Sequence, residues 1–184
     1  MNGVAAAVLA AGSGSRMGGP KAELVIDGTR LLNRVVGAAR AAGCAPVYAV
    51  VRDGTDVAEA IAVVNPHPDR GMRSSLDLAV AAAADTDALA VLLVDNPGIS
   101  AEAIAAVAAA WSPGRIAIGR YSERSGHPIV MGPDLWRAAL DVAGPDEGAR
   151  AFLAAHAELI DEVDVPGDPS DLDTPDELAR WQQK

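Results

Sequence analysis

Hydrophobic runs and amphipathic stretches alternate along the chain. Continuous apolar runs at 4–11, 47–51, 61–64 and 89–94 predict strands buried on both faces of a sheet, as parallel strands are. Stretches with apolar residues three or four positions apart predict helices at 29–42, 72–84, 100–111, 133–142, 147–156 and 175–182. Shorter runs at 116–119, 128–131 and 160–165 predict further strands, and 56–60 predicts a short helix.

This alternation predicts a single domain over residues 1–184 with an α/β fold. The expected architecture is a Rossmann-like, three-layer α/β/α arrangement around a mostly parallel sheet. Ser100 and Thr174 are typical N-caps, and Pro175 after Thr174 suits the first helical position. Ligands of such folds bind at the carboxyl ends of the strands. We therefore expect the chemistry in residues 12–21, 52–53, 65–66 and 95–96, which follow the four longer predicted strands.

Composition narrows the possible functions. The formal net charge of −10 disfavours nucleic acid or an anionic membrane as a partner, because both require a basic surface. The single cysteine, Cys44, excludes a disulfide within the chain and a cysteine metal cluster. The first apolar run lacks a preceding basic region and is too short to cross a bilayer, so we expect a cytoplasmic protein. An acidic protein that handles polyanions must gather its few cations at one place.

Such a gathering occurs in residues 9–21, which read Leu-Ala-Ala-Gly-Ser-Gly-Ser-Arg-Met-Gly-Gly-Pro-Lys. Glycines let the backbone approach a ligand and turn its N–H groups toward an anion. Arg16 suits bidentate binding of phosphate oxygens, and Lys21 adds a point charge. A dinucleotide fingerprint would need a helix to start where Gly18-Gly19-Pro20 breaks it, and a P-loop would need a hydroxyl where Ala22 stands.

The same segment resembles the signature of nucleotidyltransferases of the sugar-nucleotide and molybdenum-cofactor type. The resemblance implies a fold of the nucleotide-diphospho-sugar transferase type, with a loop that holds the triphosphate of an incoming NTP. The residues that it places at the nucleotide are Leu9, Ala10, Gly12, Ser13, Gly14, Ser15, Arg16 and Lys21.

A second segment indicates a branch of that family. It runs from Asn65-Pro66 through Gly71-Met72 to Ser74-Ser75-Leu76. It resembles the molybdenum cofactor cytidylyltransferase (MobA-like) branch, and this resemblance adds Asn65, Ser74 and Ser75 to the nucleotide-binding residues. Physically, Gly71 opens a helix whose first N–H groups and serine hydroxyls suit an anion or a base edge.

Two acidic positions predict a metal site. Asp95 ends a buried strand, and Mg²⁺ needs only one or two carboxylates beside phosphate oxygens. Relatives carry Asp-Gln-Pro here with the Asp on magnesium, whereas this chain has Asn96 in place of the Gln. Asp171 and Asp173 share a side of an extended segment that resembles the family's Asp-Ile-Asp-Thr-Pro. Asp173 is the preferred second ligand and Asp171 the alternative. Asn96, His127 of a Gly-His-Pro segment, and Asp171 are placed on the acceptor side.

These features predict a Mg²⁺-dependent nucleotide transfer, in which a phosphate or hydroxyl oxygen of the acceptor displaces pyrophosphate in line. The resemblance implies CTP as the donor, so that CMP is the group transferred. Positioning and charge neutralisation carry the catalysis, with Arg16, Lys21 and Asp95 as the catalytic residues. The resemblance implies molybdopterin as the acceptor and a molybdoenzyme or chaperone as the receiver of the product. GTP and other small phosphorylated acceptors are alternatives. The rival classes are a dinucleotide-dependent oxidoreductase and a non-catalytic nucleotide-binding module.

Overall fold

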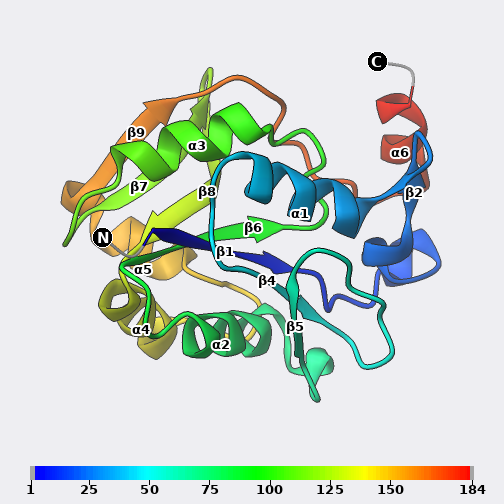
Figure 1. Ribbon diagram of the computed structural model, residues 1–184, viewed down its shortest axis with the longest axis horizontal. Helices are drawn as coiled ribbons and strands as arrows, with labels where there is room; N and C mark the ends of the chain where they lie inside the picture. Colours follow the sequence, from blue (N-terminus) through cyan, green and yellow to red (C-terminus); the bar gives the residue numbers. More distant parts are fainter. Residues whose placement is uncertain (1–2, 183–184) are drawn as a thin grey trace.

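A seven-stranded sheet forms the middle of the molecule (Figure 1). The computed structural model describes residues 3–182, and the order of the strands across the sheet is β5-β4-β1-β6-β8-β7-β9. The strands are β1 (Val4–Leu9), β4 (Val47–Val51), β5 (Ile61–Val64), β6 (Ala88–Leu93), β7 (Ile116–Tyr121), β8 (Arg124–Met131) and β9 (Ile160–Asp164). A separate two-stranded hairpin pairs β2 (Val25–Ile26) with β3 (Thr29–Arg30).

Helices cover both faces of the sheet, which confirms the predicted three-layer α/β/α fold (Figure 1). On one face lie α1 (Leu31–Ala41) and α3 (Ala101–Ala110), and on the other lie α2 (Met72–Ala82), α4 (Pro133–Val142) and α5 (Arg150–Ala155). The terminal helix α6 (Pro175–Trp181) lies near the β2–β3 hairpin, beyond the ends of the strands. Short 3-10 turns are η1 (Ser15–Met17), η2 (Lys21–Glu23), η3 (Pro68–Arg70) and η4 (Ala157–Leu159).

The sheet is mostly parallel, as predicted. β1 pairs in parallel with β4 and β6, and β4 pairs in parallel with β5. The exception is β8, which runs antiparallel to both of its neighbours, because a tight turn joins it directly to β7. The carboxyl ends of β5, β4, β1 and β6 therefore share one edge of the sheet.

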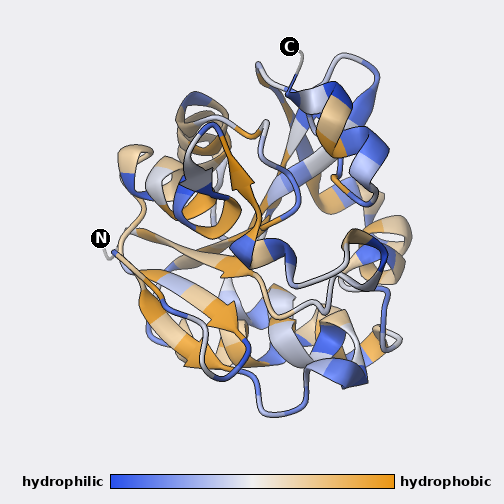
Figure 2. Ribbon diagram, turned by 90° about the vertical axis from the view of Figure 1, so that its right-hand side faces the viewer, coloured by the Kyte–Doolittle hydropathy of each residue, from blue (hydrophilic) through white to orange (hydrophobic). Residues whose placement is uncertain are grey.

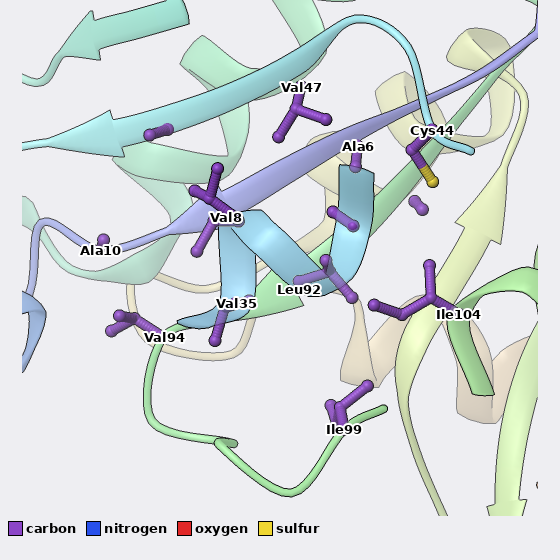
Figure 3. Packing of buried hydrophobic residues seen from close by; sticks show 14 of the residues in the cluster. Ala6, Val8, Ala10, Val35, Cys44, Val47, Leu92, Val94, Ile99 and Ile104 are labelled. Carbon is purple, nitrogen blue, oxygen red and sulfur yellow. The ribbon is translucent and has the colours of Figure 1, made fainter. Parts of the chain in front are cut away.

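Small side chains dominate the two packed layers. Ala6 and Ala7 on β1 are fully buried, which brings the helices close to the sheet. Val8 and Leu92 belong to the same packed cluster as Val35 of α1 (Figure 3). Cys44 lies in this cluster, and burial raises the pKa of its thiol to about 11, so it serves as a small core residue.

Several predicted boundaries were wrong. The short helix expected at 56–60 is absent, since Glu59 has a φ of 60° and its carbonyl accepts a hydrogen bond from Arg40 at 3.0 Å. The helix expected from residue 29 begins at Leu31, because Thr29–Arg30 pair with Val25–Ile26. The helix expected at 147–156 is reduced to α5, since Gly148 has a φ of 53°. The strands expected at 116–119 and 128–131 extend to form a longer hairpin.

Both predicted N-caps are confirmed. The Ser100 hydroxyl accepts a hydrogen bond from the Ala103 N–H at 3.1 Å at the start of α3. Thr174 and Glu177 form a reciprocal capping box at the start of α6, which anchors the segment carrying Asp173. Within residues 3–182, no helix has both the length and the hydrophobicity needed to cross a membrane.

Candidate active site

The ends of β1 and β6 place two predicted site segments side by side. Leu9 and Leu93 are register partners, and the Val94 N–H donates to the Leu9 carbonyl at 3.2 Å. The glycine-rich loop and Asp95 therefore start from neighbouring points of one sheet edge. Figure 2, which faces this edge, shows hydrophobic strands behind largely hydrophilic connecting segments. The predicted convergence of polar groups at the strand ends is thus observed.

The glycine-rich loop folds back on itself after Gly12. The Gly14 carbonyl accepts hydrogen bonds from the Met17 N–H at 2.8 Å and the Gly19 N–H at 3.3 Å. Gly14 has a φ of 59°, and a methyl group on it would lie 1.9 Å from the Gly19 carbonyl oxygen. Only glycine satisfies both conditions at this position. The backbone around Gly12 and Ser13 stays exposed at the surface.

Lys21, at the end of the loop, joins two carboxylates that are distant in the sequence. Its Nζ donates to Oδ2 of Asp95 at 2.8 Å and to Oδ1 of Asp173 at 2.5 Å. We call this arrangement the Lys21 bridge. Burial lowers the pKa of the Lys21 ammonium, but its hydrogen bonds to Asp173 and Asp95 and the attraction of their charges together hold that pKa above its usual value. The hydrogen bond from Lys21 holds the pKa of Asp173 below its usual range, with a smaller contribution from Arg16.

Arg16 differs from Lys21 in having no fixed partner. It is exposed on η1, and within residues 3–182 no hydrogen bond or ion pair engages its guanidinium. Its charge nevertheless reaches Asp173, whose pKa it helps to lower. The loop therefore contributes one cation held against carboxylates and one that remains available to a ligand.

Two adjoining cavities open beside Asp95 and the glycine-rich loop. The first, of about 400 Å³, is bordered by Gly12, Ser13 and Asp95, and we call it the loop cavity. The second, of about 500 Å³, is bordered by Asn96 and the β7–β8 hairpin, and we call it the hairpin cavity. Their common walls are Leu9, Met72, Leu93 and Asp146. The consecutive residues Asp95 and Asn96 thus face one cavity each.

The loop cavity also includes Arg52, which belongs to a strand-end segment expected at the site but was given no role, and Asp146, which was not expected there. Arg52 donates from Nε to the Ala11 carbonyl at 2.9 Å and from Nη2 to Asp69 at 3.0 Å. Its position directly after a strand was the signal that placed it among the candidates. Asp146, which precedes the helix expected at 147–156, lies across the start of α2, where a methyl group on Gly71 would be 2.4 Å from its Oδ1.

Asn65, Ser74 and Ser75 form one hydrogen-bonded unit. The Asn65 amide donates to the Ser74 hydroxyl at 2.9 Å and to the Ser75 hydroxyl at 3.0 Å, and Asn65 is buried. Ser74 donates in turn to the Gly71 carbonyl at 2.8 Å. Of the three, Ser75 lines the loop cavity, while Asn65 and Ser74 shape the turn that leads into α2.

His127 and Asn96 border the hairpin cavity in fixed orientations. His127 Nδ1 lies 3.0 Å from the Val91 carbonyl oxygen, which only accepts, so Nδ1 carries the hydrogen. Burial lowers the pKa of His127, which favours the neutral ring and leaves Nε2 as a hydrogen-bond acceptor. The Asn96 amide donates to Asp171, so these two predicted acceptor-side residues contact each other.

The carboxylate pair at the Lys21 bridge is the candidate metal-binding group. Among residues 3–182 there is no cluster of three or more His, Cys, Asp or Glu side chains suited to an ion. Asp95 and Asp173 nevertheless direct oxygens at a single cationic atom from different segments of the chain. Mg²⁺ uses one or two carboxylates together with phosphate oxygens and water, so the pair fits such an ion when a nucleotide supplies the remaining ligands.

Comparison with known proteins finds an enzyme that is similar in sequence and solved structures that share the fold. Nicotine blue oxidoreductase of Paenarthrobacter nicotinovorans is 33% identical over 194 residues, covering 96% of this chain and 95% of that protein. Rv0371c of Mycobacterium tuberculosis H37Rv has the same fold, with a TM-score of 0.86 at 22% identity over 100% of this chain and 99% of that one. A manganese complex of Rv0371c gives a TM-score of 0.82 at 23% identity, with 99% of each chain covered.

The family itself is identified by a match to a domain model. The model of the MobA-like NTP transferase domain matches residues 6–160, which include the glycine-rich loop, Asp95 and the β7–β8 hairpin. The predicted family is therefore confirmed: the chain belongs to the MobA-like NTP transferase family, a family of nucleotidyltransferases.

Proposed function

We propose that this chain is a divalent-metal-dependent enzyme that transfers CMP from CTP to the phosphate of a small acceptor and releases pyrophosphate. The observation that carries this proposal is the position of Asp95 and Asn96. They follow one strand and face two cavities that share walls. A nucleotide in the loop cavity and an acceptor in the hairpin cavity would meet beside Asp95.

The glycine-rich loop is the proposed triphosphate site. Gly12, Ser13 and Ser15 are exposed there, and the hydrogen bonds around Gly14 keep the loop compact before a ligand arrives. Arg16 and Lys21 would hold the leaving pyrophosphate, where charge-assisted bonds stabilise the developing negative charge. Leu9 and Ala10 act as the buried base of the loop. Ser75 presents its hydroxyl to the nucleotide from α2, supported by Asn65 and Ser74.

Asp95 and Asp173 are the proposed ligands of the divalent ion, with Mg²⁺ as the preferred metal. When bound, the ion would neutralise the oxygens of the reacting phosphate. The carboxylates keep their positions through contacts of their own segments, because the Leu172 N–H donates to the Asp95 carbonyl at 2.9 Å. The manganese complex of Rv0371c supports a divalent ion in this fold. Asp171 contacts Asn96 rather than the Lys21 bridge, which favours Asp173 as the second ligand.

The hairpin cavity is the proposed acceptor site. Leu76, Ile129 and Trp136 form an apolar part of its wall, and the charged residues around it are two arginines, Arg124 and Arg150, and three carboxylates, Asp146, Glu147 and Asp171. The two arginines would receive the anionic group of an acceptor. Such a cavity suits a ring system that carries an anionic group, and molybdopterin has this chemistry. An acceptor phosphate already carries the attacking oxygen in ionised form near neutral pH, so no general base is required. His127 Nε2 would accept a hydrogen bond from the ring of the acceptor.

GTP is the alternative nucleotide, and another small phosphorylated compound is the alternative acceptor. The substitution of Asn96 for the usual Gln lies in the wall of the acceptor cavity, so it bears on the acceptor rather than on the base. With molybdopterin as acceptor, the product would pass to a molybdoenzyme or its chaperone, and the enzyme would act in the cytoplasm.

A pyrophosphate-release assay tests the proposal. The protein is mixed with each of the four NTPs, Mg²⁺ or Mn²⁺, and candidate acceptors, with the molybdenum-bound pterin phosphate first. We expect release with CTP that depends on both metal and acceptor. Preference for GTP would shift the assignment to the guanylyl variant. Nucleotide binding without release under every condition would favour a non-catalytic binding module.

A redox function is the second candidate, and the 33% identity to nicotine blue oxidoreductase favours it. The apolar hairpin cavity also suits a flat conjugated molecule, and the loop cavity could accept the phosphates of a dinucleotide. The two functions differ in their requirements, because electron transfer from a reduced nicotinamide dinucleotide needs neither an NTP nor a bound divalent ion. Oxidation of NADH or NADPH in the presence of nicotine blue, followed at the absorbance of the reduced nicotinamide, would support the redox candidate.

A further inference from the structure

The Lys21 bridge connects three segments that are far apart in the sequence. Asp95 lies 74 residues from Lys21, and Asp173 lies 152 residues from it. The side chain of Lys21 is 15% exposed, compared with 24% for Asp95 and 44% for Asp173. A partly buried ammonium between two carboxylates removes their mutual repulsion, which is what a divalent ion would do at the same place.

A metal ion and the Lys21 ammonium would compete for the same oxygens. Mg²⁺ needs its oxygen ligands at about 2.0–2.1 Å in a nearly octahedral arrangement. An ion bound jointly by Oδ2 of Asp95 and Oδ1 of Asp173 would stand in the space that Nζ of Lys21 fills. Two cations so close together repel strongly in a partly buried environment.

We propose that Lys21 is an internal competitor of the divalent ion, which keeps the Asp95–Asp173 pair closed until a nucleoside triphosphate draws the ammonium away. This inference rests on the proposed nucleotide transfer. A triphosphate in the glycine-rich loop offers Lys21 a larger negative charge, and the flexible lysine stem allows the ammonium to turn toward it. Nucleotide then binds before the metal or together with it, and the two ligands bind cooperatively.

The two segments that carry the carboxylates are held by backbone hydrogen bonds that do not involve Lys21. The Leu172 N–H donates to the Asp95 carbonyl at 2.9 Å, and the Asp173 N–H donates to Oε2 of Glu177 at 2.8 Å. Glu177 belongs to the capping box that starts α6. These bonds hold the two segments together after Lys21 has moved, so the pair remains able to bind an ion.

The test is the binding of Mn²⁺ alone, measured by electron paramagnetic resonance of the free ion, with no nucleotide present. We expect Lys21→Met to bind Mn²⁺ roughly 10- to 100-fold more tightly than the wild type, which is the range of typical coupling between two sites. Lys21→Arg keeps the positive charge and is the matched control, with no comparable gain. Combining Lys21→Met with Asp95→Asn should abolish the gain and so locate the ion at the pair.

Further measurements keep the inference testable if Lys21→Met folds poorly. Lys21→Gln, with its fold verified by circular dichroism, should show the same gain. In the unmodified protein, CTP should tighten Mn²⁺ binding beyond the binding of Mn²⁺ to free CTP. Equal Mn²⁺ affinity in the wild type and the neutral Lys21 variants would overturn the inference, as would wild-type Mn²⁺ binding that is equally tight with and without CTP.

The inference and the proposed function fail in different ways. Pyrophosphate release from a wild type that binds Mn²⁺ equally well without nucleotide would leave the transferase intact and remove the competition. Tighter Mn²⁺ binding by Lys21→Met, with no pyrophosphate release from the wild type under any condition, would retain the competition and remove the transferase.

Discussion

The two halves of the sheet use their ion pairs differently. In the half formed by β8, β7 and β9, Arg120 of β7 pairs with Asp164 of the neighbouring strand β9, and Arg115, directly before β7, pairs with Asp161 of β9. The other half, formed by β5, β4, β1 and β6, is the parallel half. There, Lys21 pairs with Asp95 and Asp173 beyond the ends of the strands. The first set joins strands that already share a ladder of hydrogen bonds, whereas the second joins loops.

This difference separates charges that support the fold from charges that are available for chemistry. Exposed pairs such as Arg120–Asp164 contribute little to stability, because water screens them. The Lys21 bridge lies at the edge where the cavities open, and its groups would exchange partners when a ligand binds. The position of an ion pair relative to the strand ends is therefore more informative about function than the distance between its nitrogen and oxygen atoms.

The largest expected effect distinguishes Asp95 from Asp164. Asp95→Ala should lower kcat for pyrophosphate release by roughly 100- to 1000-fold, as the loss of a main electrostatic group at a reacting centre does. Asp164→Ala removes a carboxylate of the other set and should leave kcat unchanged. Steady-state kinetics on both variants, with folding verified by circular dichroism, tests the contrast. Full activity of Asp95→Ala would refute its role.

The second effect compares two arginines. Arg16→Ala should reduce kcat/KM for the nucleotide by roughly 10- to 100-fold, because a charged hydrogen bond to phosphate contributes about 1.5–3 kcal/mol. Arg120→Ala should leave kcat/KM unaffected, since its guanidinium is already engaged by Asp164 on the other half of the sheet. Equal losses in the two variants would show that Arg16 acts only through the general charge of the surface.

Sequence patterns predicted the parallel half well for a physical reason. β1 and β6 are buried on both faces, so they appear in the sequence as continuous apolar runs, and their ends mark the start of the functional loops. The glycine-rich loop, Lys21 and Asp95 were found by this route, and the structure brings the last two into contact.

Other features depend on contacts that no local pattern records. Neither the contact between Asn96 and Asp171 nor the fixed tautomer of His127 follows from spacing, because each needs a partner brought close by the fold. Arg52 was noted after a strand but not assigned, since its partners Ala11 and Asp69 come from separate loops. The β7–β8 hairpin was predicted too short, because its polar turn end lacks an apolar pattern.

The third prediction tests whether contacts within the glycine-rich loop constrain its backbone. Gly14→Ala should destabilise the fold by about 1–3 kcal/mol through backbone strain, and it should also weaken nucleotide binding, because the new methyl group meets the Gly19 carbonyl. Gly114→Ala, in the turn before β7, also has a positive φ but meets no atom within 4 Å. It should cost about 1–2 kcal/mol and leave nucleotide binding intact. Urea unfolding and nucleotide titration measure the two effects.

The smallest effect concerns the two helix caps. Both Thr174→Ala and Ser100→Ala remove an N-cap hydroxyl, a loss that costs about 1 kcal/mol. Ser100 starts α3, which is packed on β7, so its loss should appear in the global free energy of unfolding. Thr174 starts α6 beside Asp173, so its loss should instead loosen that carboxylate and raise the Mn²⁺ concentration needed for half-maximal pyrophosphate release.

Hydrogen exchange and a metal titration of the two cap variants separate these outcomes. Faster exchange confined to α6 in Thr174→Ala, with an unchanged denaturation midpoint, would show that the capping box serves the carboxylate rather than the core. A metal requirement that stays the same in Thr174→Ala would show that the Leu172–Asp95 backbone bond is sufficient to hold the segment of Asp173 in place. The contrast between the two halves of the sheet would then depend only on where their ion pairs lie relative to the strand ends, and α6 would not contribute to it.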